Sequence, residues 1–396
     1  MRKKIVLLLQ GGGALGAFQC GAWKALFPFI QENGHELVAV AGASIGAVNA
    51  ALIARHFHDT DGGNEALRNF WCNQVATPPA PFFAAPGEYW RSWNGLLTGL
   101  LLGNRALFRP AYQYWNPVGD LFRFHMPLYR TDRAERTLKT AFGRYRGNAP
   151  LLVVGATDVN TGEALLFDSA SRTVTAKMLV ASIAIPMLFS PVEIDDRICW
   201  DFEMRSNTLL PDVFALLRAK LPHRDTPEDL LFIIVDMLNP DAARMPASTL
   251  ESHYRFTNIL LGNKLEYDRH VFEIGNEYLR AMERIHQLVD QEDGSPLADV
   301  IRQEYERAVM DRHGRVELLH IGRDQFEYEY ISRDFDYSPQ YISKLIAQGE
   351  TRALDAIDEY RQRLDRESRA QMERPDGAPR TSGGGGYHRL VQDRIV

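Results

Sequence analysis

Residues 37–48 read Leu-Val-Ala-Val-Ala-Gly-Ala-Ser-Ile-Gly-Ala-Val, so an apolar run meets an alanine-rich segment through Gly42-Ala43-Ser44-Ile45-Gly46. The run predicts a buried strand and the segment after it predicts a helix. A tight turn between them needs glycines, here Gly42 and Gly46, and lifts the serine hydroxyl to a helix N-terminus at the edge of a sheet. The pattern predicts that Ser44 is a nucleophile, with an ordinary glycine–serine turn as the alternative.

A glycine-rich loop lies one strand before this turn. Residues 5–9 are a continuous apolar run, as expected of a strand buried on both faces. The glycines that follow are Gly11, Gly12, Gly13 and Gly16. Consecutive glycines let backbone N–H groups approach a phosphate or an oxyanion. The spacing also fits a dinucleotide fingerprint, but that pattern expects an acidic residue after the second strand, where this chain has the serine turn. We therefore favour an oxyanion hole, beside Ser44 on a neighbouring parallel strand.

Composition excludes several classes of protein. The formal net charge is −6, whereas nucleic-acid binders usually carry a basic surface, so we expect no nucleic-acid partner. No apolar run is long enough to span a bilayer. The basic and apolar start resembles a signal peptide, but its apolar run is short and no cleavage site follows. The three scattered cysteines have no metal-ligand spacing and fit a reducing compartment. We expect a cytoplasmic protein, with peripheral contact to a membrane left open.

The apolar patterning predicts an α/β fold with a mostly parallel sheet. The predicted strands are 5–9, 37–41, 151–159, 164–167, 191–194, 197–200, 230–235 and 316–321, and the predicted helices are 17–30, 47–57, 131–142, 173–185, 211–220, 250–289 and a helical pair within 338–364. We expect a catalytic domain over residues 1–245, a mainly helical extension over 246–365 and a flexible tail over 366–396.

Residues 78–130 interrupt the alternation of strands and helices. A proline-rich stretch is followed by many Trp, Tyr, Phe and Leu residues. This insertion predicts a cap that offers an apolar surface to acyl chains or lipids, or else a small subdomain with its own aromatic core.

A serine nucleophile needs a base, which is usually a histidine held by an acid. The downstream histidines stand in polar or helical settings without a site-like pattern, and His56 and His58 lie too far along the predicted helix after Ser44. Asp201 follows the apolar residues Ile-Cys-Trp, and partial burial would raise the basicity of its carboxylate. Asp158 competes because it also follows a strand, although its surroundings look like turn chemistry.

These blocks together resemble the patatin-like phospholipase family over residues 5–240. The blocks in family order are Gly11-Gly12-Gly13-Ala14-Leu15-Gly16, Gly42-Ala43-Ser44-Ile45-Gly46 with Asn49-Ala50, Ala156-Thr157-Asp158 with Thr161-Gly162, Ala181-Ser182-Ile183-Ala184-Ile185-Pro186 with Phe189-Ser190-Pro191-Val192, and Trp200-Asp201 with Ser206-Asn207-Thr208. The C-terminal region, with Ser338-Pro339 and Gly349, is similar to the helical extension of a bacterial subgroup.

The resemblance implies a three-layer α/β/α fold and a Ser44–Asp201 dyad, with an oxyanion hole at Gly11, Gly12 and Gly13. It implies acyl-ester hydrolysis through an acyl-enzyme, without metal or cofactor, on a lipid or acyl-ester substrate. We expect a lipase, phospholipase A or carboxylesterase. The alternative is a weakened or inactive family member that binds lipid surfaces or granules. Chain-length and head-group preference and the oligomeric state stay open.

Two departures from the family pattern bear on these expectations. Leu15 stands where the family usually has Arg or Lys. Asp201-Phe202-Glu203 replaces Asp-Gly-Gly or Asp-Gly-Ala. A left-handed backbone at Phe202 or Glu203 would cost on the order of 1–2 kcal/mol per residue. The second carboxylate, from Glu203, would raise the pKa of Asp201.

Overall fold

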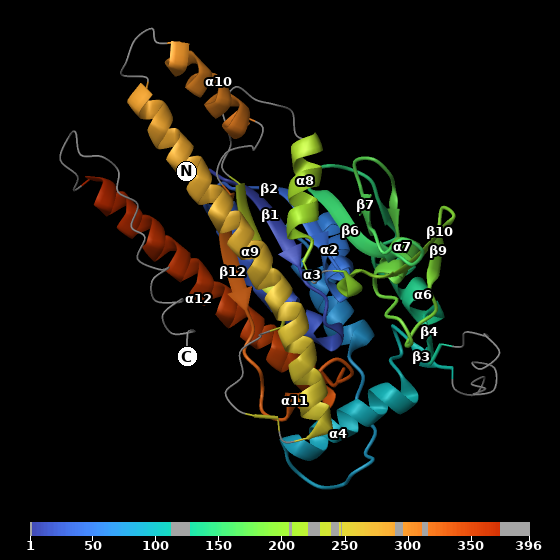
Figure 1. Cartoon of the computed structure of the whole chain (residues 1–396). Coiled ribbons are helices and arrows are strands. Elements are labelled where there is room, and N and C mark those ends of the chain that lie inside the picture. The colour runs from blue at the N-terminus through green and yellow to red at the C-terminus, as the bar shows by residue number, and fades with distance from the viewer. Residues whose placement is uncertain are drawn as a thin grey trace.

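A mostly parallel sheet of eight strands forms the centre of the molecule (Figure 1). The computed structural model describes residues 2–111, 127–205, 208–220, 230–238, 245–246, 248–289, 296–310 and 316–372. The strands are β1 Lys4–Leu9, β2 Glu36–Gly42, β6 Leu151–Asp158, β7 Ala164–Asp168, β9 Val192–Ile194, β10 Arg197–Asp201, β11 Leu230–Asp236 and β12 Val316–Gly322. Their order is β12-β11-β1-β2-β6-β10-β9, with β7 also paired to β6. The strands from β12 to β6 run parallel, whereas β7, β9 and β10 pair antiparallel at the other end of the sheet.

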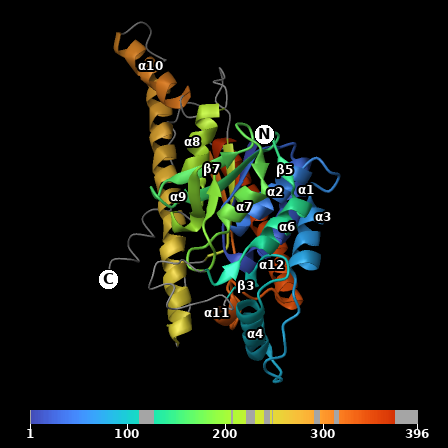
Figure 2. The ribbon, with the colours of Figure 1, turned by 90° about the vertical axis from the view of Figure 1, so that its right-hand side faces the viewer.

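Helices cover both faces of the sheet, which confirms the predicted three-layer α/β/α fold. One face carries α1 Ala17–Glu32, α2 Ile45–His56, α7 Ala176–Ser182 and α12 Pro339–Met372, and the other carries α8 Leu210–Lys220 and α9 Thr249–Val289. Figure 2 shows α8 and α9 on the side opposite α1, α2 and α12. Successive residues of β1 alternate between the two cores, which explains why its apolar run is continuous.

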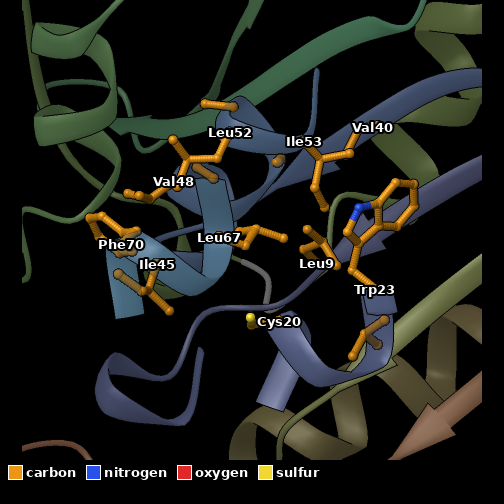
Figure 3. Close-up of a cluster of buried hydrophobic side chains, with 14 of the residues drawn as sticks. Leu9, Cys20, Trp23, Val40, Ile45, Val48, Leu52, Ile53, Leu67 and Phe70 are labelled. Carbon is orange, nitrogen blue, oxygen red and sulfur yellow. The ribbon is translucent and has the colours of Figure 1, made fainter. Parts of the chain in front are cut away.

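The larger core packs α1 and α2 against the sheet, as Figure 3 shows. Leu9 and Val40 come from adjacent parallel strands, Trp23 comes from α1, and Val48 and Leu52 come from α2. All five side chains are almost fully buried. This packing fixes the start of α2, and with it the position of Ser44, relative to the loop that follows β1.

The remaining helical elements are short or lie at the periphery. They are η1 Gly13–Gly16, α3 Asn64–Arg68, η2 Asn69–Val75, α4 Glu88–Leu97, η3 Thr98–Leu102, α6 Asp132–Ala141, η5 Phe202–Met204, α10 Pro296–Met310 and α11 Glu329–Ser332. Two short strand pairs complete the structure: β3 Arg109–Pro110 with β4 Tyr129–Arg130, and β5 Arg144–Tyr145 with β8 Val174–Thr175. No helix in the described ranges is both long and apolar enough to cross a membrane.

The C-terminal segment, residues 316–372, is built into the same fold. Strand β12 extends the sheet beside β11, and α12 packs along α1. A Cβ atom on Gly21 would overlap the carbonyl of Ile346, and one on Gly349 would overlap the carbonyl of Phe18, so the two helix backbones nearly touch. The helical pair predicted within 338–364 is wrong, because α12 is one continuous helix that also includes residues 366–372. The rest of the predicted tail lies outside the described residues.

The aromatic insertion packs in part on this C-terminal segment. Arg91 of α4 makes an ion pair of 2.7 Å with buried Asp336, and the rings of Tyr89 and Tyr328 meet edge to face. The stretch 112–126, which holds some of the predicted aromatic residues, lies outside the described part of the chain.

Candidate active site

Ser44 stands on a strained turn between β2 and α2. Its backbone has φ 52° and ψ −129°, a conformation that few non-glycine residues adopt. A Cβ atom on Gly42 would overlap the backbone of Gly46, and one on Gly46 would overlap the carbonyl of Leu9. Both predicted glycines are therefore required by close backbone approach. The turn presents the Ser44 side chain at the carboxyl edge of the sheet, as the sequence pattern indicates.

Ser182, at the end of α7, holds the backbone of this turn. The N–H of Ser44 donates to Ser182 Oγ at 3.0 Å, and that hydroxyl donates to the carbonyl of Gly155 at 2.6 Å. This role was not predicted, because a serine that fixes another serine's backbone leaves no sequence pattern beyond its place in a family block.

The glycine loop lies beside Ser44, as the parallel pairing of β1 and β2 requires. Gly12 and Gly13 have φ of 147° and 56°. Two hydrogen bonds hold the end of the loop. Asn49 Nδ2 donates to the carbonyl of Gly16 at 2.9 Å, and Trp71 Nε1 donates to Asn49 Oδ1 at 2.9 Å. A Cβ atom on Gly16 would lie 2.7 Å from the ring of Trp71. Asn49, quoted above only as part of a family block, thus orients the loop.

Some backbone N–H groups of the loop bind other residues, and others have no partner among the described residues. The N–H of Ala14 donates to the carbonyl of Asp334 at 3.2 Å, so it is committed to the C-terminal segment. Within the described part of the chain, the N–H groups of Gly12, Gly13 and Ile45 make no hydrogen bond to another residue. These three residues line a cavity together with Ser44, whereas Gly11, the first glycine of the predicted oxyanion hole, is not among its lining residues. Their donors are therefore available to an oxyanion formed at Ser44.

Asp201 ends β10 next to Ser44 and is buried, with 1% of its surface exposed. Burial raises the pKa of Asp201 to about 7, against smaller lowering by the backbone N–H of Glu203 and the Ser44 hydroxyl. Its Oδ1 accepts the Glu203 N–H at 2.9 Å, while Oδ2 has no hydrogen-bond partner among the described residues. The carboxyl group thus combines contact with Ser44, basicity raised by burial and an uncommitted oxygen, which are the properties of a general base.

Asp158 is committed elsewhere. Its carboxylate makes an ion pair of 2.7 Å with Arg197 and accepts the N–H of Asn160 at 2.8 Å, and these hydrogen bonds lower its pKa. The turn chemistry inferred from its sequence explains this arrangement. Of the histidines, His253 reaches the mouth of the cavity from α9, which the sequence did not predict. His56 pairs with Asp59, and His125, His223, His313 and His388 lie outside the described residues.

The departure at residues 202–203 has a different effect from the one expected. Neither Phe202 nor Glu203 has a positive φ, because the chain forms the short 3-10 turn η5, which Asp201 caps through the Glu203 N–H. The side chain of Phe202 is buried in the core next to Gly155. The expected backbone strain is therefore absent from these two residues. Burial, rather than the Glu203 carboxylate, is the main cause of the raised pKa of Asp201.

The cavity above Ser44 has a volume of about 410 Å³ and a largely apolar wall. Its lining residues are Gly12, Gly13, Ser44, Ile45, Leu107, Phe108, Thr131, Ile183, Ile185, Pro186, Met187, Leu188, Phe189, Glu203, Leu238, His253, Tyr254, Thr257, Leu261, Arg333, Asp334, Phe335 and Tyr337. The aromatic insertion contributes Leu107 and Phe108 to this wall, and α9 and the C-terminal segment contribute the last eight residues. The latter were not predicted, since no local motif marks them.

Comparison with known proteins agrees with the fold and the motifs. No curated protein matches the chain. Among the solved structures that match, two show the following weak similarity. VipD from Legionella pneumophila is 14% identical with a TM-score of 0.34, over 90% of this chain and 67% of that chain. The type III effector protein ExoU is 12% identical with a TM-score of 0.24, over 88% and 77% of the two chains. Residues 7–213 match the patatin-like phospholipase family, and the chain belongs to that family.

Proposed function

We propose that this protein is a lipid acyl hydrolase that cleaves fatty-acyl esters through a Ser44–Asp201 dyad and an acyl-enzyme. The observation that carries the proposal is the position of Ser44. Its side chain stands on a strained turn, next to the buried Asp201 carboxyl group and in the lining of a largely apolar cavity. This arrangement joins a candidate nucleophile, a base and room for an acyl chain.

The chemistry proceeds in two steps. Ser44 Oγ attacks the ester carbonyl while Asp201 takes the hydroxyl proton, and the carbonyl oxygen becomes an oxyanion. The N–H groups of Gly12, Gly13 and Ile45 stabilise that oxyanion. Asp201 then returns its proton to the departing alcohol, which leaves an acyl group on Ser44. Asp201 next takes a proton from water, whose oxygen attacks the acyl carbon. The bond to Ser44 Oγ then breaks, the fatty acid leaves, and Asp201 returns the proton to the serine.

The cavity supports an acyl ester as the substrate. Its wall consists mainly of aliphatic and aromatic side chains, such as Phe108, Phe189 and Leu261, which suit a hydrocarbon chain. The charged lining residues Arg333 and Asp334 form an ion pair of 2.9 Å with each other. The cavity therefore offers mainly apolar contact to a substrate.

A fluorophosphonate probe tests the proposal directly. We expect the pure protein to become labelled at Ser44 and to hydrolyse p-nitrophenyl esters of medium-chain fatty acids, and we expect Ser44→Ala to lose both properties. Ser169→Ala is a matched control, because Ser169 is also buried but lies outside the cavity. A folded wild-type protein without Ser44-dependent labelling would exclude the proposal.

The second candidate function is a lipid-surface or granule-binding protein that keeps the fold but has little activity. The observation in its favour is Glu203, whose carboxyl group stands beside Ser44 where the family usually has a small residue. Phe202 is part of the core, so Glu203→Gly alone is the informative variant. If the wild type is inert and Glu203→Gly hydrolyses esters, this second function is favoured.

A further inference from the structure

The carboxyl group of Glu203 lies beside the side chain of Ser44 in the candidate site. Glu203 Oε1 fills the space that a Cβ atom on Gly11 would need, and Ser44 Cβ lies 2.7 Å from that position. Gly11 is therefore the residue that makes room for this carboxyl group. Glu203 also lines the cavity together with Ser44, Gly12 and Gly13.

One oxygen of this carboxyl group has no hydrogen-bond partner among the described residues. Oε1 is buried and has no hydrogen-bond partner within the described ranges. The two cations that influence it are engaged elsewhere: Arg333 binds Asp334 and Asn258, and Lys264 donates to the carbonyl of Arg205 at 3.1 Å. A buried polar atom without a partner is costly, so it indicates a group that a ligand satisfies.

The surroundings of this carboxyl group favour its neutral form. Burial is the main cause that raises the pKa of Glu203 well above its usual range. The carboxylates of Asp201 and Asp334 raise it further, while Arg333 and Lys264 lower it less. A neutral carboxylic acid carries an O–H donor, and one held beside an oxyanion adds no negative charge.

We propose that Glu203 is a further catalytic residue, whose carboxyl O–H donates a hydrogen bond to an oxygen of the ester that binds at Ser44. This inference rests on the proposed hydrolase function. In a cavity with a largely apolar wall, the ester is the part of an acyl substrate that places acceptor oxygens beside Ser44. The glycine or alanine usual at this position of the family has no side-chain donor. Glu203 would thus add a hydrogen-bond donor that a glycine or alanine lacks. Ionisation of its carboxyl group would remove that donor and place a negative charge beside the oxyanion, so it would slow the reaction.

Ester hydrolysis over a range of pH separates a donor from a mere obstruction. The substrates are p-nitrophenyl esters, and the variants are Glu203→Gln, which keeps a donor but cannot ionise, and Glu203→Ala, which has none. We expect kcat/KM of Glu203→Ala to fall by roughly 10²-fold, as when one oxyanion donor is removed. We expect Glu203→Gln to keep most of the activity and to lose the decline at high pH. Glu193→Gln, an exposed carboxyl on β9, should match the wild type.

The opposite result overturns the inference. If Glu203→Ala is as active as the wild type, or more active, the carboxyl group obstructs the site rather than serving it. Thermal unfolding of each variant distinguishes these outcomes from misfolding. Fluorophosphonate labelling of the same proteins reports separately on Ser44. If the hydrolase proposal fails, neither the wild type nor any variant becomes labelled.

A binding experiment tests Glu203 even if hydrolysis is not detected. Isotope-labelled methyl decanoate is bound to Ser44→Ala, which cannot react with it, and the infrared stretch of the ester carbonyl is recorded. We expect this band at a lower frequency in Ser44→Ala than in the double variant Ser44→Ala, Glu203→Ala, with the glutamine double variant in between. Equal frequencies, or no binding to either protein, would contradict the inference.

Discussion

The family-matching region, residues 7–213, and the C-terminal segment contribute different things to one cavity. The first supplies Ser44, the glycine loop and Asp201, each from a short pattern at the end of a strand. The second supplies a wall, and the carbonyl of its Asp334 accepts the N–H of Ala14 in the loop. The chemistry of the candidate site is thus local in sequence, whereas its shape depends on contacts more than 300 residues apart.

This difference can be tested first at the nucleophile, where we expect the largest effect. Ser44→Ala and Ser44→Gly should both lose ester hydrolysis by at least roughly 10³-fold, because the dyad loses its nucleophile. Glycine tolerates the positive φ of this turn, so Ser44→Gly should be about 1 kcal/mol more stable than Ser44→Ala in urea unfolding. Retained hydrolysis in both variants would place the nucleophile elsewhere.

Asp201→Asn should lose ester hydrolysis and gain stability at neutral and alkaline pH. Burial raises the pKa of Asp201 from 3.8 to about 7, so the folded chain holds a proton that the unfolded chain releases between these values. Wild-type stability should therefore fall as pH rises from about 4 to 7, and asparagine, which cannot ionise, should remove that loss. We expect Asp201→Asn to be inactive and on the order of 3 kcal/mol more stable than the wild type at pH 8.

The control for this prediction is the same comparison at pH 4. There the wild-type carboxyl group is protonated when folded, so the two proteins should differ little in their free energy of unfolding. In the wild type, hydrolysis should rise through pH 7 as Asp201 becomes a base. A stability difference that does not depend on pH would contradict the assigned state of Asp201.

Sequence reasoning reached most of the family-matching region, for a physical reason. Apolar runs buried on both faces, glycines at tight turns and a serine at a helix start are set by neighbours in the chain, so Ser44, Gly12 and Asp201 could be singled out. The roles of Asp201 as base and Gly12 as oxyanion donor stay predictions.

Local sequence patterns could not predict the cavity wall formed by α9 and the C-terminal segment, or the turn after Asp201. Tyr254 and Arg333 line the cavity because α9 and the C-terminal segment meet above the glycine loop, which is a tertiary contact without a local pattern. Phe202 was expected to strain the backbone, but the chain relieves that strain by forming η5 and burying the ring. The sequence predicts a helical pair where the structure has the single helix α12. The apolar residues of α12 that pack with α1 are spread among polar ones along the chain.

Arg333→Ala tests whether the wall is separable from the chemistry. The buried guanidinium pairs with Asp334, binds Asn258 and lies 4.6 Å from the centre of the Tyr254 ring. Removing it should cost about 1–3 kcal/mol of stability, since half-buried Asp334 loses its ion-pair partner and Asn258 loses a hydrogen-bond donor. KM for long acyl esters should rise more than KM for short ones, because the cavity wall around Arg333 loosens while Ser44 stays in place.

The matched control is Arg361→Ala, a half-exposed arginine on α12 whose ion pair with Asp358 spans 3.5 Å. Surface pairs of this kind contribute about 0–1 kcal/mol, so little change is expected in unfolding or hydrolysis. If Arg333→Ala lowers hydrolysis of short and long esters equally, the C-terminal segment takes part in the chemistry and the division between the two regions fails.

The smallest effect should come from Gly349→Ala, which changes a contact between the two regions outside the lining of the cavity. The added methyl group would meet the carbonyl of Phe18 in α1, so the helices must separate slightly, at a cost of about 1–3 kcal/mol. Leu354→Ala, at an exposed position on the same helix, should cost less than about 0.5 kcal/mol. Both variants should keep the wild-type pH dependence of hydrolysis. If Gly349→Ala alters that pH dependence, the packing of α12 on α1 reaches the dyad, and the C-terminal segment tunes the chemistry as well as the shape.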